Sequence, residues 1–211
     1  MYRIVEARNV GLNIKEFVIE APRIAHKQKP GQFLILRLHK KGERIPLTIK
    51  SSDAQAGAVT IVVQAISKTT MMLNCLEPGD SILDIVGPLG HPSEIENYGT
   101  VVVLAGSVGT AMALPTARAL KQAGNHVIFI EGARNAEMVI CEDEVREASS
   151  EACMMTDDGR YGEQGMVTKK LNELIAAGRR IDFVLAVGPV PMMRAVAQLL
   201  RRPTPGPPDR G

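Results

Sequence analysis

The stretch VVVLAGSVGTAMALP, from Val101 to Pro115, carries residues suited to binding an anion. An apolar run typical of a strand ends at Gly106, and a pattern typical of a helix begins after Gly109. Between a strand and a helix, backbone N–H groups and the positive end of the helix dipole converge, and a phosphate can bind there. The spacing is G-x-x-G, not the G-x-G-x-x-G of the common dinucleotide fingerprint. A tight turn that needs glycine only for its backbone angles stays an alternative.

Three more segments with polar or glycine residues follow predicted apolar strands in the same half of the chain. In an open parallel sheet the carboxyl ends of the strands gather at one edge, and ligands bind there. Each segment alone is also typical of a turn, a cap or core packing. Their shared position indicates a ligand site. The segments are Glu131–Arg134 (EGAR), Thr156–Gly159 (TDDG) and Gly188–Met193 (GPVPMM).

A further candidate lies in the first half of the chain, in the run RIPLT from Arg44 to Thr48. An arginine, a chain break at Pro46 and a hydroxyl two residues later can clamp a phosphate and hydrogen-bond a planar ring. The same run also fits an edge strand with a solvated arginine, because proline in a sheet is confined to edges.

The elements that must position these residues change in kind near residue 98. Up to about Gly87, short apolar runs alternate with turn residues, which is typical of an antiparallel barrel or sandwich. Later, apolar strands alternate with amphipathic helices, which predicts a parallel sheet with right-handed crossovers. We expect a β domain over 1–97 and an α/β domain over 98–200. The predicted strands are 2–8, 14–21, 32–38, 44–49, 59–65, 81–86, 100–106, 126–134, 152–159 and 182–189, and the predicted helices are 67–76, 110–124, 136–150, 166–178 and 191–200.

The composition favours an enzyme or a small-ligand protein. The 25 Lys and Arg against 23 Asp and Glu are scattered, and aromatic residues make up 3% with no Trp, so no nucleic-acid footprint is seen. No stretch approaches a membrane span and the N-terminus lacks a signal pattern, so we expect a cytoplasmic protein with no membrane contact. Cys75, Cys141 and Cys153 lie far apart and fit neither a disulfide framework nor a metal site.

Taken together, these segments resemble the ferredoxin reductase superfamily, in which an antiparallel FAD-binding β-barrel precedes a Rossmann-like NAD(P)-binding domain. Within it, the chain is most similar to the alpha (small) subunits of NADH-dependent reduced ferredoxin:NADP+ oxidoreductase, the sulfide dehydrogenase type, and is related to the dihydroorotate dehydrogenase electron transfer subunits. The matching runs, in the family's order, are PGQFLILR, GERIPLTI, SKTTMMLNCLEPGDSILDIVGPLGHP, AGSVGTAMALP, EGARN, TDDGRYGEQG and GPVPMM.

The resemblance implies an FAD site in the first domain. Arg44 would contact the FAD pyrophosphate, the backbone after it would lie against the isoalloxazine, and Val62–Gln64 would follow the ribityl side. A helix N-terminus at Thr69 and Thr70 would add a second pyrophosphate contact. Ser67 stands where the family has glycine, which we expect to perturb that turn. The implied FAD-binding residues are Arg44, Ile45, Pro46, Leu47, Thr48, Val62, Val63, Gln64, Thr69 and Thr70.

The resemblance also implies an NAD(P) site in the second domain, with hydride passing directly between nicotinamide and flavin and no catalytic side chain. Glu131 would accept a hydrogen bond from a ribose 2′-OH, whereas Arg134 would attract a 2′-phosphate. Because the family's small subunit is associated with NAD(H), we expect NAD(H) rather than NADP(H). The implied residues are Gly106, Ser107, Gly109, Thr110, Glu131, Arg134, Asp157, Asp158, Gly188, Pro189, Met192 and Met193.

Two departures from the family concern the passage of electrons. Val187 stands where many relatives have cysteine, so any help from that thiol in hydride transfer would be absent. Relatives end in four closely spaced cysteines for a [2Fe–2S] cluster, whereas residues 201–211 are proline-rich without cysteine. We therefore expect a disordered tail, no metal site and no cluster in this chain, and a truncated or frameshifted member of the family.

The function implied by the resemblance is that of an NAD(P)H-dependent flavin oxidoreductase. The chain would be an electron-transfer flavoprotein subunit, paired as a heterodimer with a larger flavin and iron–sulfur subunit or serving ferredoxin. Three alternatives stay open: a non-catalytic nucleotide-binding remnant, a dihydroorotate dehydrogenase electron transfer subunit, and a stand-alone flavin reductase.

Overall fold

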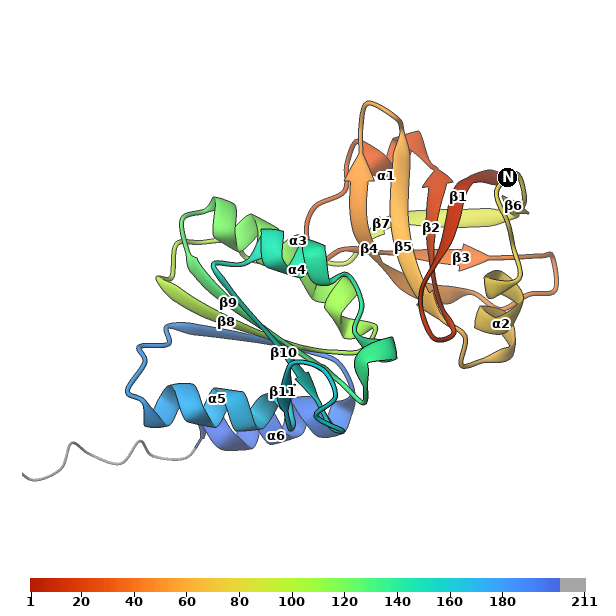
Figure 1. Cartoon of the computed structure of the whole chain (residues 1–211). Coiled ribbons are helices and arrows are strands. Elements are labelled where there is room, and N and C mark those ends of the chain that lie inside the picture. Colours follow the sequence, from red (N-terminus) through yellow and green to blue (C-terminus); the bar gives the residue numbers. More distant parts are fainter. Residues whose placement is uncertain (202–211) are drawn as a thin grey trace, which may run out of the picture.

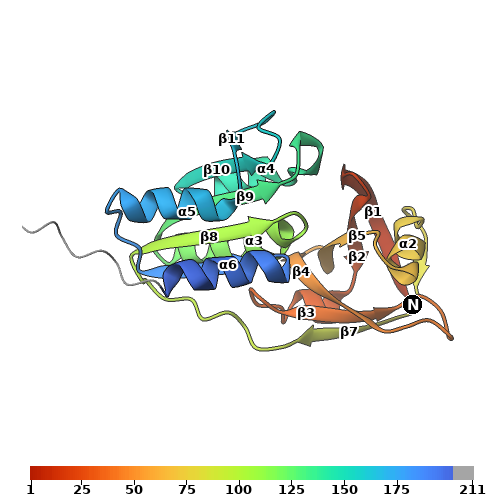
Figure 2. The same cartoon turned by 90° about the horizontal axis from the view of Figure 1, so that it is seen from below.

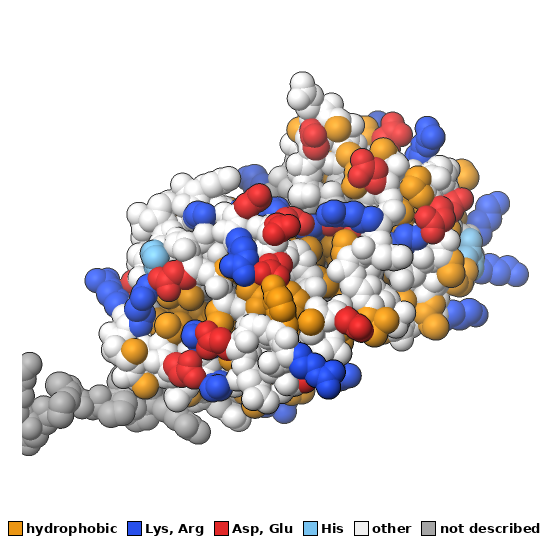
Figure 3. All heavy atoms as spheres, in the orientation of Figure 1, with side chains coloured by type: hydrophobic (Ala, Val, Ile, Leu, Met, Phe, Trp, Pro, Cys, Tyr) orange, Lys and Arg blue, Asp and Glu red, His pale blue; other side chains and the backbone are white. Residues whose placement is uncertain are grey.

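The computed structural model describes residues 1–201, which form a β-barrel followed by an α/β domain (Figure 1). The predicted proline-rich tail lies outside the described residues except for Arg201. No helix of the described part is long and apolar enough to cross a membrane. On the face shown in Figure 3, acidic and basic side chains are intermixed.

The barrel is a seven-stranded antiparallel sheet with the strand order β6-β1-β2-β5-β4-β3-β7. The two strands at the ends of this order, β6 and β7, are separated in the chain only by Leu83, so the sheet rolls into a near-closed barrel. Fully buried side chains such as Phe17, Leu34 and Ile61 fill it. The strands are β1 (Tyr2–Gly11), β2 (Ile14–Glu20), β3 (Phe33–Arg37), β4 (Ile45–Asp53), β5 (Ala58–Gln64), β6 (Ser81–Ile82) and β7 (Asp84–Leu89).

The expected single strand over 81–86 was wrong. Ser81 and Ile82 pair with β1, whereas the residues from Asp84 onward pair with β3. The bend at Leu83 passes the chain from one end of the sheet to the other, which the run of apolar residues alone does not reveal.

Two short helices belong to the barrel, α1 (Pro22–Ala25), which was not expected, and α2 (Lys68–Asn74), which was. Ser67 begins α2 with a capping box: its Oγ accepts from the Thr70 N–H, and the Thr70 hydroxyl accepts from the Ser67 N–H. Serine at this position therefore makes a well-formed helix start, and its effect on a phosphate contact stays a prediction.

The second domain is a parallel sheet with the order β11-β10-β9-β8-β12, as expected. Helices α3 and α4 cover one face and α5 and α6 the other (Figures 1 and 2). The elements are β8 (Thr100–Gly106), α3 (Gly109–Gln122), β9 (His126–Ala133), the 3₁₀ turn η1 (Ala136–Met138), α4 (Glu142–Ala148), β10 (Glu151–Thr156), β11 (Glu163–Gln164), α5 (Val167–Ala176), β12 (Phe183–Val187) and α6 (Val190–Leu200).

The helix expected over 136–150 is shorter than predicted. After η1 the chain is extended, Cys141 has a left-handed backbone with a φ of 57°, and α4 begins only at Glu142. Ile140 is buried against the barrel residues Ile14 and Val62, and its N–H donates to the Glu131 carboxylate instead of to a helical carbonyl. Contact between the domains thus overrides the local helical pattern.

A cluster of charged side chains joins the two domains. Lys50 on β4 donates to Glu16 on β2 and to Glu144 on α4. Arg8 pairs with Glu16 at 2.6 Å, and Arg118 of α3 pairs with Glu144. Burial alone would lower the pKa of Lys50, but its hydrogen bonds to Glu144 and Glu16 more than offset this and raise it. The ammonium group therefore stays charged while 3% exposed, and it bridges carboxylates of both domains.

We expect Lys50→Met to lower the free energy of unfolding by about 3 kcal/mol, because Glu16 and Glu144 then face each other without the cation between them. Urea unfolding monitored by circular dichroism measures the change. Lys27→Met is the matched control on the exposed end of the barrel, with an expected change within about 0.5 kcal/mol. Equal effects of the two substitutions would show that the cluster does not stabilise the fold.

Candidate functional site

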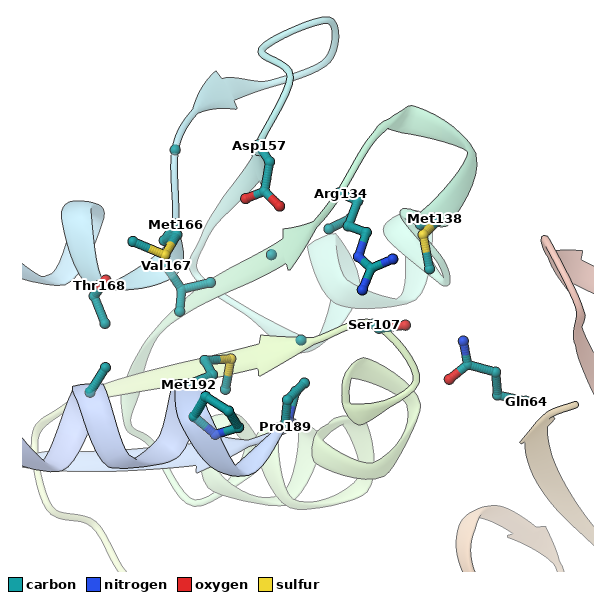
Figure 4. Close-up of a pocket in the computed structure, with 16 residues that line it drawn as sticks. Gln64, Ser107, Arg134, Met138, Asp157, Met166, Val167, Thr168, Pro189 and Met192 are labelled. Atoms are coloured by element: carbon teal, nitrogen blue, oxygen red, sulfur yellow. The ribbon is translucent and has the colours of Figure 1, made fainter. Parts of the chain in front are cut away.

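A cavity of about 510 Å³ lies at the carboxyl edge of the parallel sheet (Figure 4). It reaches from Gln64 of the barrel, past the glycine turn after β8, to Thr168 at the start of α5. The loops that sequence analysis selected do meet here. Of the residues predicted for the second domain, those that line the cavity are Gly106, Ser107, Arg134, Asp157, Pro189 and Met192.

The turn between β8 and α3 combines a left-handed backbone residue with a helix start that has no side-chain cap. Ser107 adopts a left-handed backbone with a φ of 53°, and its N–H donates to the carbonyl of Gly132 at 3.1 Å. Helix α3 then begins at Gly109 without any side-chain cap. The positive end of a 14-residue helix is therefore left for a ligand to complement.

Gly109 is also required by packing. A Cβ atom at this position would lie 2.5 Å from the carbonyl oxygen of Val187 and 3.1 Å from the Cα of Gly188. The glycine turn after β8 and the turn after β12 thus pack backbone against backbone. This packing agrees with the interpretation of the glycine residues as a tight turn, and the anion site stays a prediction. The Val187 side chain packs against the core on the α3 side of the sheet, and it does not line the cavity.

Thr110 and Glu131 are placed differently from what the resemblance implies. Both are fully buried, and neither lines the cavity. Glu131 Oε1 accepts from the Ile140 N–H at 2.9 Å, whereas Oε2 has no partner among the described residues. Burial raises the pKa of Glu131 to about 7. The expected contact of Glu131 with a ribose is not met by this geometry, because the carboxyl lies beneath the turn.

The two acidic residues after β10 have different surroundings. Asp157 lines the cavity, on the same side as Arg134 in Figure 4. Asp158 instead accepts from the N–H of Arg160 at 3.1 Å, which is ordinary turn chemistry. Gly188 and Met193 belong to the turn and helix that carry Pro189 and Met192, but they do not line the cavity.

Sequence reasoning missed the start of α5. The cavity wall there is formed by Gly165, Met166, Val167 and Thr168, which follow β11. The signal was present, because a helix pattern after a predicted strand at 152–159 must begin at this same edge of the sheet. Gly132, Ala133 and Pro191 also line the cavity and lie within the predicted segments Glu131–Arg134 and Gly188–Met193, whereas Met138 and Ala195 were not predicted.

The predicted residues of the barrel flank a fork between β4 and β5. The two strands pair with each other over residues 49–53 of β4 and 58–61 of β5. The segment of β4 before this, 45–48, pairs with β3 alone, and the segment of β5 after it, 62–64, pairs with β2 alone. Each segment therefore presents an edge free of the other strand, as a proline requires. The side chains of Val62 and Val63 are buried, so this part of β5 offers its backbone.

Arg44 and Thr69 lie near the open end of this fork. Arg44 is exposed directly before β4, and its neighbour Glu43 accepts from the Thr69 hydroxyl at 2.8 Å. This contact holds the chain before β4 against the start of α2. The Thr70 hydroxyl is used within the capping box.

The first 93 residues match the family model of the oxidoreductase FAD-binding domain. Over 191 residues the chain is 44% identical to the dihydroorotate dehydrogenase B (NAD(+)) electron transfer subunit homolog of Thermotoga maritima, a match covering 90% of this chain and 67% of that relative. It is 28% identical over 204 residues to the dihydroorotate dehydrogenase B (NAD(+)) electron transfer subunit of Geobacillus thermodenitrificans, covering 94% and 77%.

Solved structures give the same relationship. A chain of the NADH-dependent reduced ferredoxin-NADP oxidoreductase matches with a TM-score of 0.91 and 38% identity, over 96% of this chain and 72% of the solved one. Phthalate dioxygenase reductase matches with a TM-score of 0.73 and 18% identity, over 96% and 64%, which is a similarity of fold alone.

Gly109→Ala tests the close approach of the two turns. The added Cβ meets a backbone oxygen that cannot move independently of β12, so we expect the free energy of unfolding to fall by about 2–3 kcal/mol. Gly106→Ala is the control within the same turn, because the Cβ there meets the Met192 sulfur at 3.0 Å, which can rotate away, and Pro189 Cδ at 3.2 Å, both milder contacts than the 2.5 Å to backbone at Gly109. A cost for Gly109→Ala no larger than for Gly106→Ala would contradict this account of the turn.

Proposed function

The chain belongs to the FAD-binding oxidoreductases of the ferredoxin reductase type, the family of the dihydroorotate dehydrogenase B electron transfer subunits, and from this we propose that it carries electrons between NAD(H) and an FAD held by its barrel. The observation that carries the proposal is the continuity of the two sites. One cavity runs from the barrel residue Gln64 to the far loops of the parallel sheet, so a dinucleotide lying in it has one end at the barrel.

The residues of the α/β domain fit a dinucleotide in one direction. Its pyrophosphate would meet the turn before α3, where the helix dipole favours an anion and where Ser107 Oγ, without a hydrogen-bond partner among the described residues, can donate. The nicotinamide would then point toward Gln64 and the barrel. The adenosine would lie toward Asp157 and Thr168, on the side of the cavity away from Gln64.

The residues of the barrel fit FAD. The open edges of β4 and β5 offer backbone donors and acceptors to a planar ring and its ribityl chain. The exposed guanidinium of Arg44 suits a pyrophosphate, which it can bind in a bidentate manner. The buried hydroxyl of Thr69, now bonded to Glu43, is the second donor at this end of the fork.

The two cofactors supply the hydride chemistry, and the chain supplies orientation. Pro189 on the turn after β12 and Met192 at the start of α6, both close to Gly106, line the cavity. These apolar side chains would keep water from the place where nicotinamide and flavin would meet.

We infer that the chain works with a larger partner subunit, because the relatives from Thermotoga maritima and Geobacillus thermodenitrificans are named as an electron transfer subunit homolog and an electron transfer subunit. The names point to two kinds of partner, a dihydroorotate-oxidising subunit, which would supply electrons to the FAD, and a ferredoxin-linked one, which would accept them. Reduction of the oxidised flavin by the first partner with dihydroorotate, or reoxidation of the reduced flavin by the second, distinguishes them.

We expect purified protein, after incubation with FAD, to hold about one FAD per chain and to be bleached by NADH without oxygen. Arg44→Ala is expected to weaken FAD binding about 10- to 100-fold, the loss of one charge-assisted contact. Flavin absorbance after gel filtration measures it, and Arg23→Ala on the exposed part of α1 is the control. Protein that stays colourless with excess FAD would favour the nucleotide-binding remnant instead.

Iron and labile sulfide assays test the separate expectation that no [2Fe–2S] cluster is held.

We propose that Asp157, not Glu131, sets the preference for NAD(H), because its carboxylate lines the cavity and would repel a 2′-phosphate. Asp157→Asn is expected to shift the ratio of the dissociation constants for NADPH and NADH by about tenfold toward NADPH, which corresponds to about 1.4 kcal/mol. Asp158→Asn serves as the control, because the Asp158 carboxylate lies in the same turn but accepts from the Arg160 N–H and does not line the cavity. A ratio that changes equally in both variants would remove this role from Asp157.

A further inference from the structure

Three polar side-chain atoms around the glycine turn are buried without a hydrogen-bond partner among the described residues: Ser107 Oγ, Thr110 Oγ1 and Glu131 Oε2. In the sheet register, Glu131 lies opposite Ala105 and Gly132 lies opposite Gly106. The carboxyl of Glu131 therefore lies one position before the turn, on the face covered by α3. A buried polar atom without a hydrogen-bond partner lowers the stability of the fold, so a group of three such atoms beneath the turn between β8 and α3 needs an explanation.

The charged and titratable groups facing Glu131 come from three sides. Thr110 on α3 contributes an uncharged hydroxyl, and Glu142 and the Cys141 thiol come from the start of α4. From the barrel, Lys50 acts on Cys141, but its ammonium already bridges Glu16 and Glu144. Across the sheet, Glu131 has the apolar neighbours Ala105 and Met154. Within residues 1–201, Glu131 forms no ion pair.

This setting favours the neutral acid near physiological pH. Burial is the main cause that raises the pKa of Glu131, and the charge of Glu142 adds to it. The hydrogen bond from the Ile140 N–H and the hydroxyl of Thr110 act in the opposite direction, and the resulting value is about 7. In the free protein the carboxyl is thus poised between its two states.

We propose that Glu131 is a positioning residue of the nucleotide turn that takes up a proton from solvent when the dinucleotide binds. In the neutral form Oε2–H is a donor, and the adjacent Thr110 Oγ1 is an unpartnered acceptor at the first turn of α3. On protonation, a hydrogen bond from Oε2–H to Thr110 Oγ1 would fix the start of the helix on which the pyrophosphate would be bound. The proposal rests on the proposed function, and it adds proton linkage to it.

Electrostatics gives the direction of the linkage. A pyrophosphate bound above a buried carboxylate places like charges close together in a medium of low dielectric, and this raises the pKa of the carboxyl further in the complex. By reciprocity, the protonated protein binds the dinucleotide more tightly. Affinity is therefore highest below the pKa of about 7 of the free protein, falls as the pH rises from there through the higher pKa of the complex, and then levels off.

The experiment measures the dissociation constant of ADP-ribose for the FAD-loaded protein by calorimetry between about pH 6 and 9. ADP-ribose keeps the pyrophosphate but lacks nicotinamide, so it cannot exchange electrons with the flavin. No histidine lines the cavity within the described residues, so histidine titration does not account for a dependence in this range. We expect affinity to fall about tenfold between pH 6.5 and 8.5. Repeating the titration in two buffers of different ionisation enthalpy gives the proton uptake directly, on unaltered protein.

Glu131→Gln keeps the size of the side chain, accepts from the Ile140 N–H and donates to Thr110, but cannot ionise. We expect its affinity to be independent of pH and equal to the low-pH affinity of the wild type. Glu137→Gln, an exposed change on η1, is the matched control and should keep the wild-type profile. A merely structural role for Glu131 would lower affinity at every pH without changing the slope.

The failure of each proposal can be told apart. If ADP-ribose does not bind at any pH, the dinucleotide site itself is wrong. If it binds with the same affinity and no proton uptake across the range, or if Glu131→Gln keeps the wild-type slope, the proton-linked role of Glu131 is overturned and the dinucleotide site stands.

Discussion

The buried ammonium group of Lys50 is the contact on which the arrangement of the two sites depends. It extends from β4 of the barrel and reaches carboxylates of β2 and α4, each of which also binds an arginine. A buried cation must keep its partners within hydrogen-bonding distance, so the cluster allows little rotation between the domains. Beside it, the apolar contact of Ile140 with Ile14 and Val62 adds a second fixed point. The carboxyl edge of the parallel sheet is thereby held facing the fork between β4 and β5.

The nucleotide turn is fixed from below in a similar way, by what is buried beneath it. The Gly109 backbone touches the Val187 carbonyl, so the turn after β8 cannot shift without moving β12. Glu131 anchors the irregular chain at Ile140, and this chain in turn packs on the barrel. One buried carboxyl therefore connects the start of α3, the connection to α4 and the contact between the domains.

Much of this architecture can be predicted from periodicity. The alternation of strands and helices after Tyr98 predicts the parallel sheet, and its carboxyl edge follows from topology alone, so the loops at Gly106, Arg134 and Asp157 could be grouped before any coordinates were known. What could not be predicted depends on long-range contacts. The bend at Leu83 exists because the barrel closes, and Ile140 leaves the helical pattern because the barrel offers it an apolar contact. The alternation of side chains along β9 predicts that Glu131 shares a face with Val127 and Phe129. It does not predict that α3 covers this face and buries the carboxyl.

The individual sequence motifs of this chain are unspecific, and the chemistry expected of a flavin and nicotinamide site gives a physical reason for this. Hydride transfer between two bound cofactors needs no proton donor or nucleophile from the protein, so the demand on the chain is geometric. Geometry here comes from the backbone: the uncapped start of α3, the open edges of β4 and β5, and the close approach of two turns at Gly109. Backbone groups are supplied by almost any residue, so few side chains are dictated, and those few are glycines and a proline. A site of this kind is recognised by the order and spacing of several weak features, because no single one of them is specific.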